Sequence, residues 1–208
     1  TYYQYLHALD ITTGAEKANS PVLITATVNG NGDGSVGGKV TFDPQKQNQR
    51  PGLLLLNGIV YIAWSSHCDW GPYHGWVMGY DKTSLLQKYV YNTTPDGYWG
   101  GIWMSGGGPS ADESGNIYLA AGNGSVGKNG NAADVTNRSE SALKLTPSLT
   151  LSSFFTPKNY ETLEGADLDF GVTQMLLIPN TNRAIVGVKD GKLYLLNRDN
   201  MGGYNGSA

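Results

Sequence analysis

The sequence has little charge, a single cysteine and no long apolar run. Charged residues make up 15% of the 208 residues, below the ~25% of an average soluble domain. The one cysteine, Cys68, excludes an intrachain disulfide, which suits either a reducing compartment or an exported bacterial protein without disulfides. No apolar run reaches the ~18 residues of a membrane-spanning helix, and the 14 lysines and arginines are scattered. These shortages argue against a membrane span and against a nucleic-acid partner, which would need clustered basic residues.

Glycine and tyrosine are abundant instead. The chain has 29 Gly and 13 Tyr, and hydrophobic residues form 39% of it, enough for a core. Aromatic and β-branched residues favour strands, while Gly and Asn favour turns. The composition therefore predicts an all-β, turn-rich domain and argues against both a helical bundle and a disordered chain.

A short strand that ends in a polar turn recurs along the chain. Its four copies lie at 5–10, 76–81, 141–146 and 192–197. A more apolar strand precedes three of them, at 58–64, 115–121 and 182–188. The apolar strand of each pair should be buried on both faces, whereas the second strand alternates and should have one wetter face.

Small antiparallel sheets repeated along a chain are typical of a β-propeller. We therefore expect residues 1–208 to form one domain, a partial ring of about four four-stranded antiparallel blades, with the paired strands adjacent. A β-sandwich is the alternative, but it gives no reason for the pair to recur three times. We expect no long helix, only one turn at 160–166. The chain starts inside a strand and without Met, so we expect it to be a piece of a longer propeller.

Six segments carry recognisable motifs. They are L-H-A-L-D-I-T-T-G at 6–14, S-H-C-D-W-G-P-Y-H-G-W-V at 66–77, W-M-S-G-G-G at 103–108, N-I-Y-L-A-A-G-N at 116–123, T-P at 156–157 with D-L-D-F at 167–170, and K-D-G-K-L-Y-L-L-N-R at 189–198. In content and order they resemble the repeats of quinoprotein dehydrogenases, the alcohol and methanol dehydrogenases that depend on pyrroloquinoline quinone (PQQ). The resemblance covers almost the whole chain. It implies a propeller fold and a bacterial, extracytoplasmic location, either periplasmic or extracellular.

This family holds its quinone with a Ca²⁺ ion on the propeller axis, so the resemblance also implies site residues. Matched by motif, the Ca²⁺ ligands fall on Asp69 and Asn123, the general base on Asp169, and the cofactor contacts on Lys189, His74 and Ser105. The residue types suit this chemistry, because Ca²⁺ prefers carboxylate and amide oxygens and a carboxylate can accept the proton of an alcohol.

The sequence departs from the family's pattern at three points. Asp69 stands where the family has the longer Glu, and His74 stands where it has Arg. The tryptophan beneath the quinone should follow glycines 106–108, yet residues 109–114 contain none. We therefore expect a binding or scaffold domain that has lost the cofactor and serves a small molecule or protein. A Ca²⁺/PQQ-dependent dehydrogenase of alcohols or sugars is the alternative.

Several candidates also have plainer roles that stay open. Asn123 precedes Gly124 and could serve only a turn, and Lys189 flanks a hairpin turn at 190–191. A zinc site at His67, Cys68 and His74 fits by ligand type but not by spacing. Because an incomplete ring leaves sheet edges unpaired, we also expect self-association through exposed blade edges.

Overall fold

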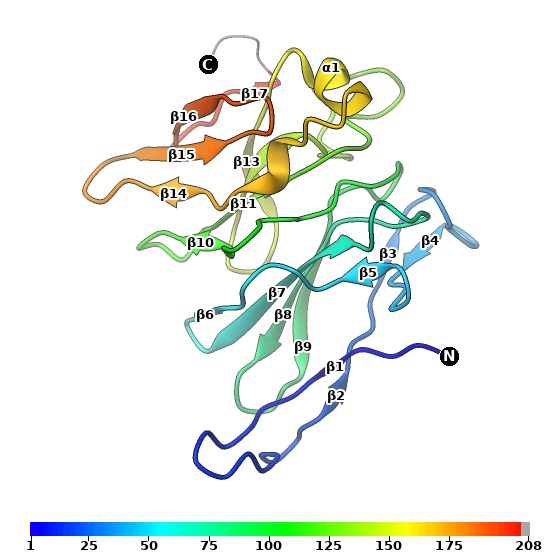
Figure 1. The fold of residues 1–208 in the computed structure, drawn as a ribbon, viewed down its shortest axis with the longest axis vertical. Coiled ribbons are helices and arrows are strands. Elements are labelled where there is room, and N and C mark those ends of the chain that lie inside the picture. The colour runs from blue at the N-terminus through cyan, green and yellow to red at the C-terminus, as the bar shows by residue number, and fades with distance from the viewer. Residues whose placement is uncertain (205–208) are drawn as a thin grey trace.

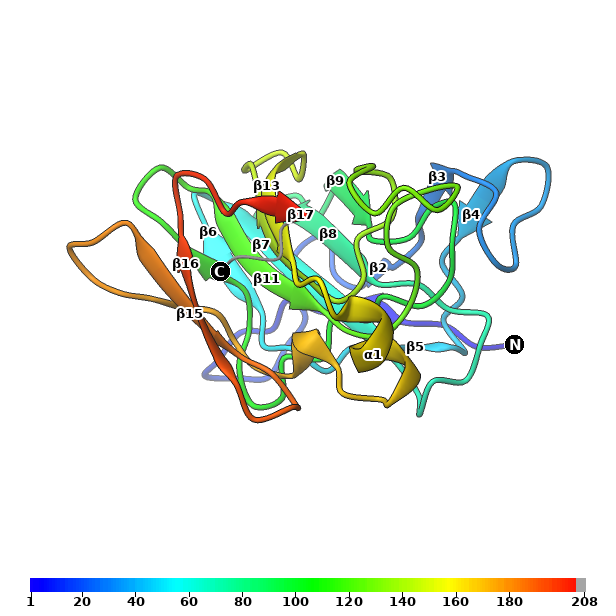
Figure 2. The same ribbon diagram turned by 90° about the horizontal axis from the view of Figure 1, so that it is seen from above.

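The computed structural model describes residues 1–204, and nearly all of its regular structure is β. Small sheets follow one another along the chain, from the N-terminal sheet at the bottom of Figure 1 to the C-terminal sheet near its top. Seen from above, the same sheets form successive layers (Figure 2). Each sheet is built mainly from neighbouring stretches of sequence, as the repeat predicts.

The second and third sheets are complete four-stranded antiparallel units. The second sheet consists of β6 (Leu54–Leu56), β7 (Ile59–Ser66), β8 (Trp76–Asp81) and β9 (Gln87–Asn92), with β5 (Gln47–Asn48) pairing the end of β7. The third sheet consists of β10 (Ser110–Ala111), β11 (Ile117–Ala121), β12 (Ser141–Leu145) and β13 (Leu151–Thr156). A short parallel strand, β17 (Gly203–Tyr204), pairs with β13.

The sheets at the two ends are smaller. The first sheet consists of β1 (Tyr5–Leu6) and β2 (Val22–Leu23), and it is followed by a hairpin of β3 (Thr27–Asn29) and β4 (Lys39–Thr41). The fourth sheet consists of β14 (Leu176–Leu177), β15 (Arg183–Gly187) and β16 (Leu193–Asn197). Between the third and fourth sheets lie the only helical segments of residues 1–204, α1 (Tyr160–Gly165) and a 3₁₀ turn, η1 (Phe170–Val172).

The predicted strand pairs are adjacent in every case. β7 pairs with β8, β11 with β12, and β15 with β16, all antiparallel. The fold class is thus confirmed as a partial β-propeller, and the single predicted helical turn is α1. The end sheets have two and three strands rather than four, because the chain supplies no further strand to them within residues 1–204.

The core lies between the sheets, and the alternation of strand side chains explains how. Ile62 and Trp64 of β7 pack against the first sheet, whereas Tyr61 and Ala63 of the same strand pack against the third. Likewise Leu119 of β11 faces the second sheet. Its neighbours Tyr118 and Ala120 face the fourth sheet. β7 and β11 are therefore buried on both faces, and each inner sheet is covered on two sides. The third of the strands expected to be buried on both faces, β15, is buried only towards the third sheet.

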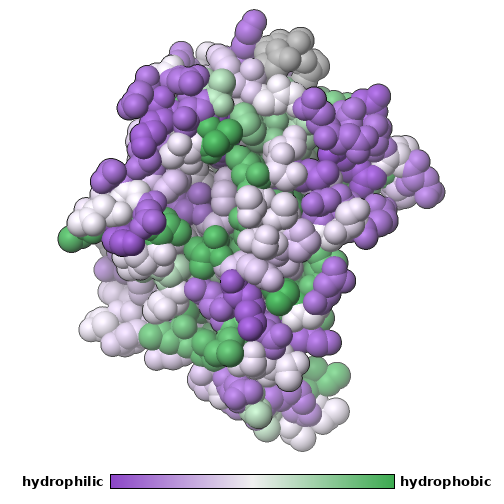
Figure 3. Space-filling view, turned by 180° about the vertical axis from the view of Figure 1, so that it is seen from behind, coloured by the Kyte–Doolittle hydropathy of each residue, from purple (hydrophilic) through white to green (hydrophobic). Residues whose placement is uncertain are grey.

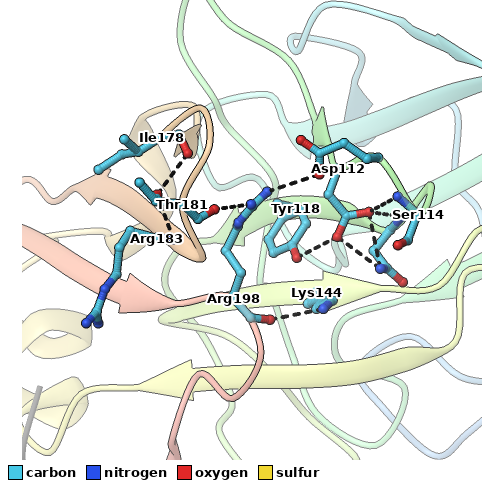
Figure 4. A network of polar contacts seen from close by, with 10 residues as sticks. Asp112, Ser114, Tyr118, Lys144, Ile178, Thr181, Arg183 and Arg198 are labelled. Carbon is cyan, nitrogen blue, oxygen red and sulfur yellow. Dashed lines mark hydrogen bonds and ion pairs between the residues drawn. The ribbon is translucent and has the colours of Figure 1, made fainter.

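The third and fourth sheets are also joined by a polar network, which we call the Asp112–Arg198 network (Figure 4). The Tyr118 hydroxyl donates a hydrogen bond of 2.9 Å to Asp112 Oδ2. Lys144 of β12 donates a bond of 3.0 Å to the carbonyl oxygen of Arg198, just after β16. The Arg198 guanidinium in turn donates to the carbonyl oxygen of Thr181. The Lys144 bond links the two sheets, whereas the Tyr118 bond lies within the third sheet and the Thr181 bond within the fourth.

No helix within residues 1–204 has the length and apolar character to cross a membrane.

Candidate functional site

A cavity of about 380 Å³ lies where loops of three sheets meet. This size is within the ~300–1,000 Å³ of small-molecule pockets. Its lining comes from β5 and the segment after it, the β7–β8 loop, the β9–β10 loop, the segment around η1 and the β15–β16 turn. The residues are Asn48, Arg50, Ser66, His67, Cys68, Asp69, Trp103, Ser105, Asp167, Asp169, Val172 and Lys189.

One wall of the cavity is a group that we call the acidic cluster: Asn123, Asp167, Asp169 and Lys189. The Lys189 ammonium lies 2.9 Å from one oxygen of Asp167 and 2.9 Å from one oxygen of Asp169. Asn123 donates its side-chain amide to Asp167 (2.9 Å) and its backbone N–H to Asp169 (3.0 Å). Burial alone would lower the pKa of Lys189, but the hydrogen bonds and charges of Asp169 and Asp167 raise it. The lysine is therefore firmly charged and bridges the two carboxylates.

Gly122 makes room for this cluster at the end of β11. A Cβ atom at Gly122 would lie 2.3 Å from Asp169 Oδ1 and 2.9 Å from Trp103 Cδ1. Both distances are far shorter than real carbon contacts. The small residue therefore allows the Asp169 carboxylate and the Trp103 ring to approach the backbone on the same side.

Asp69 reaches the cavity from a tight turn between β7 and β8. Cys68 and Asp69 both have left-handed backbone angles, with φ of 52° and 53°. The Tyr73 hydroxyl donates a hydrogen bond of 2.5 Å to Asp69 Oδ1 and fixes the carboxylate. Burial raises the pKa of Asp69, and the negative charges of Asp169 and Asp167 raise it further. Asp69 therefore lies within electrostatic reach of the acidic cluster.

Trp103 and Ser105 come from the β9–β10 loop. The Trp103 side chain is 9% exposed, and its Nε1–H finds no acceptor within residues 1–204. The Arg50 guanidinium lies over the ring, 5.9 Å from its centroid. Ser105 is positioned by its backbone N–H, which donates to the carbonyl oxygen of Val172 at 2.9 Å. Trp103 thus gives the cavity an aromatic surface, while its unpartnered Nε1–H is buried away from solvent.

A buried carboxyl group, Glu140, lies behind the acidic cluster. Its backbone N–H donates to the Gly122 carbonyl oxygen at 2.9 Å, and its Oε2 accepts from the Phe170 N–H at 2.7 Å. Its other oxygen has no partner in the described part of the chain. Burial raises the pKa of Glu140 to about 8, and the charge of Asp169 adds to this effect. At neutral pH Glu140 is therefore mostly a neutral acid.

His74 lies outside the cavity. Its Nδ1 is 2.9 Å from Thr94 Oγ1 and its Nε2 is 2.9 Å from the backbone oxygen of Asp33. The ring is buried, which lowers the pKa of His74. His74 is not among the residues that line the cavity, and its role as a cofactor contact stays a prediction. Both of its nitrogens are engaged in these contacts, so neither is free to join His67 and Cys68 on a zinc ion.

The structure therefore brings together most of the residues that the motifs single out. Asp69, Ser105, Asp169 and Lys189 line one cavity. Asn123 lies directly behind two of its carboxylates. Their roles as ligands, base and cofactor contacts stay predictions.

Sequence reasoning missed two parts of the site. Trp103 belongs to the W-M-S-G-G-G motif, but the motif does not by itself predict that Trp103 lines the cavity. A tryptophan in a Gly-rich loop could have indicated it, because loops on a β scaffold often carry binding residues. Glu140 carries no signal, because a single acid before a strand looks like any solvated residue.

The donor types fit Ca²⁺ and an anionic quinone only in part. Asn123 Oδ1 is buried without a partner, and carboxylate and amide oxygens are the ligands that Ca²⁺ prefers. However, Lys189 already binds Asp167 and Asp169. Within residues 1–204 no three His, Cys, Asp or Glu side chains form a group that could hold a metal ion.

Comparison with known proteins gives the fold. No protein-family model matches the sequence, and no curated protein matches it either. Among solved structures, quinohemoprotein alcohol dehydrogenase from Comamonas testosteroni matches with a TM-score of 0.63 and 16% identity, over 97% of this chain and 32% of that one. Quinohemoprotein alcohol dehydrogenase ADHIIG from Pseudomonas putida matches with a TM-score of 0.63 and 16% identity, over 98% of this chain and 32% of that one.

A europium-containing methanol dehydrogenase also matches, with a TM-score of 0.55 and 13% identity, over 97% of this chain and 48% of that one. The chain thus has the fold of part of a quinoprotein dehydrogenase propeller. It spans about a third of the length of the two alcohol dehydrogenases. At these identities the likeness concerns the fold.

Proposed function

We propose that this quinoprotein-like propeller segment is an extracytoplasmic binding domain that takes a small hydroxyl-rich molecule, such as a polyol or sugar, in the cavity. The observation that carries the proposal is that carboxylates, Lys189 and Arg50 line one cavity of small-molecule size together with the ring of Trp103. A hydroxyl group both donates and accepts, so it can bond to the carboxylates and to the cationic side chains alike. The flat Trp103 ring supplies an apolar surface for the carbon skeleton.

The state of Asp169 favours binding over catalysis. Its Oδ1 accepts from the Asn123 N–H and its Oδ2 from the Lys189 ammonium. Each oxygen keeps a second lone pair, but a proton taken from a substrate would disrupt the ion pair with Lys189. This arrangement suits a fixed part of the cavity wall.

The alternative is a Ca²⁺/PQQ-dependent dehydrogenase of alcohols or sugars, and the unpartnered Oδ1 of Asn123 favours it. Asp69 and Asn123 would then hold Ca²⁺, while Lys189 and Arg50 would face the carboxylates of the quinone. When bound, the cofactor would supply the hydride acceptor. Trp103 would offer a ring surface to it, in place of the tryptophan that residues 109–114 lack.

Tryptophan fluorescence and calorimetric titration with glycerol, D-glucose, and PQQ plus Ca²⁺ separate the two functions. We expect saturable binding of a polyol without Ca²⁺. Gly122→Ala should weaken it at least about tenfold, because the added Cβ displaces Asp169 and Trp103. The matched control is Gly165→Ala, where a Cβ meets nothing within 4 Å.

Two results decide against the binding proposal. Saturable binding of PQQ with Ca²⁺, together with dye reduction on adding an alcohol, would establish the dehydrogenase instead. A cavity that takes none of the three probes would overturn the proposed binding role.

A further inference from the structure

A second cavity, of about 510 Å³, lies beside the cavity of the candidate site. The two cavities share one wall. Asn123 contacts the acidic cluster of the first cavity, and the next residue, Gly124, lines the second. Likewise Asp167 lines the first cavity, whereas Glu164, near the end of α1, lines the second. Residues 123–124 and 164–167 therefore separate the two cavities.

Asp96 joins three loops at the second cavity. Its carboxylate accepts a hydrogen bond of 2.8 Å from the backbone N–H of Asn31, in the β3–β4 loop. It also pairs with Lys128 of the β11–β12 loop at 2.5 Å. The backbone N–H of Asp96 donates to Oδ1 of the buried Asn137 at 3.0 Å, in the same β11–β12 loop. The second cavity is thus formed by loops that are tied to one another, as expected of a preformed binding site.

Two tyrosine–glutamate pairs line the second cavity. The Tyr98 hydroxyl donates a hydrogen bond of 3.0 Å to Glu164, and the Tyr160 hydroxyl donates one of 3.2 Å to Glu161. Within residues 1–204 neither glutamate takes part in an ion pair. Tyr98 is 41% exposed, and its ring packs edge-on against Trp99. The glutamates therefore keep lone pairs for a ligand, and Tyr98 offers it an aromatic surface.

The lining of the second cavity suits a group that both donates and accepts hydrogen bonds. Lys128 has N–H donors besides the one bound to Asp96, and the glutamates are acceptors. Val126 is the only aliphatic side chain among the lining residues. The surface seen from behind differs, because apolar patches interrupt its hydrophilic side chains (Figure 3). No three His, Cys, Asp or Glu side chains of residues 1–204 form a metal-binding group, so hydroxyl groups fit this lining better than a metal ion does.

We propose that the second cavity holds a further sugar unit of the same ligand, so that the bound molecule is an oligosaccharide. This inference rests on the proposed function of the first cavity and specifies the class of its ligand. Every unit of an oligosaccharide carries hydroxyl groups, and each cavity combines polar side chains with an aromatic one, Trp103 in the first and Tyr98 in the second. Binding of one unit raises the effective concentration of the next, so linked units bind more tightly than a single sugar.

Calorimetric titration with D-glucose, maltotetraose and cellotetraose tests the inference. We expect at least one tetrasaccharide to bind at least about tenfold more tightly than glucose. Tyr98→Ala removes the aromatic surface of the second cavity, so it should weaken tetrasaccharide binding about fivefold and leave glucose binding unchanged. The matched control is Tyr2→Ala, because Tyr2 is also exposed and lines neither cavity. Circular dichroism checks that each variant is folded.

The pattern of affinities separates a failure of this inference from a failure of the proposed function. If glucose binds and neither tetrasaccharide binds more tightly, the second cavity holds no sugar unit, while the binding role of the first cavity stands. If Tyr98→Ala weakens the binding of glucose and tetrasaccharide equally, or changes neither, the inference is also wrong, because Tyr98 is then not part of a separate subsite. If none of the three sugars binds, both proposals are overturned.

Discussion

Two polar groups connect the third and fourth sheets, and their hydrogen bonding differs in kind. In the Asp112–Arg198 network a single carboxylate, Asp112, receives donors on both oxygens. They are the backbone N–H groups of Ser114 and Asn116, the side-chain amide of Asn116 and the hydroxyl of Tyr118. All of these donors are neutral, and the unpartnered atom of the network is a donor, Nε of Arg198.

The acidic cluster has the opposite imbalance. Two aspartates share one lysine, and the charge of Asp169 acts on both Asp69 and Glu140. Its unpartnered atom is an acceptor, Asn123 Oδ1. In the Asp112–Arg198 network the saturated carboxylate fixes the β10–β11 turn of the third sheet, and the contacts of Arg198 with Lys144 and Glu113 join that sheet to the fourth. The acidic cluster, with its spare acceptor, adjoins a cavity, and this is the arrangement expected of a place that receives a cation or a hydroxyl group.

The pKa directions express the same contrast. Burial alone would raise the pKa of Asp112, but the hydrogen bonds from Asn116 and Tyr118 outweigh it and lower the pKa. Burial raises the pKa of Glu140 to about 8. Changing each carboxyl to its amide should therefore change stability in opposite directions.

Glu140→Gln should have the largest effect. The folded pKa of Glu140 is about 8 and its ordinary value is 4.5, so the folded chain retains a proton that the unfolded chain has lost between these values. The free energy of unfolding should then fall by ~1.4 kcal/mol per pH unit across this window and level off above it. In Glu140→Gln this slope should disappear, which leaves the variant more stable than the unmodified chain at pH 8. Urea unfolding of both proteins at pH 5, 6, 7 and 8 measures this free energy. If the two plots of free energy against pH run parallel, Glu140 has no raised pKa and the prediction is wrong.

Asp112→Asn should destabilise the chain by about 2 kcal/mol at pH 7, because an amide NH₂ would face the Tyr118 hydroxyl and the Asn116 amide, which both donate. The lowered folded pKa of Asp112 means that its contribution is present above pH 4 and is lost as the pH falls further. The difference between the variant and the unmodified chain should therefore shrink in acid. The same urea series measures this. If Asp112→Asn and Glu140→Gln shift stability in the same direction at pH 8, the proposed difference between the two carboxyl groups is wrong.

The fold was predictable because it depends on patterns that repeat. Strand pairs with a doubly apolar first strand recur at 58–64, 115–121 and 182–188, and each became the centre of a sheet. The convergence of Asp69, Asp169 and Lys189 on one cavity was anticipated by motif order, because equivalent loops of stacked sheets open on the same side.

The rest of the site depends on contacts that a sequence does not display. His74 has the expected position in its motif, but its ring turns towards Thr94 and the Asp33 backbone. Trp103 brings an aromatic ring to the cavity from a different position than the family's tryptophan. Glu140 matters only because packing removes it from water, and burial is set by residues far away in the chain.

Of the three substitutions, Lys189→Gln should change the free energy of unfolding least. It should, however, have the largest effect on calcium binding. The lysine side chain is 40% exposed, so water screens the loss of its two ion pairs, and we expect a change below ~1 kcal/mol. Without the ammonium, Asp167 and Asp169 keep their charges, and the Asn123 amide oxygen beside them is still unpartnered. This is a set of hard oxygen donors with no cation, which Ca²⁺ should fill.

Calcium should therefore raise the thermal unfolding midpoint of Lys189→Gln relative to EDTA and leave the unmodified chain unchanged. The matched control is Lys192→Gln, which also removes an exposed lysine that pairs with an aspartate, Asp190, and should gain nothing from calcium. If calcium stabilises the unmodified chain at least as much as Lys189→Gln, the cation does not compete with the lysine. Asp69 and Asn123 would then hold it away from Lys189, which is the arrangement that the dehydrogenase alternative needs.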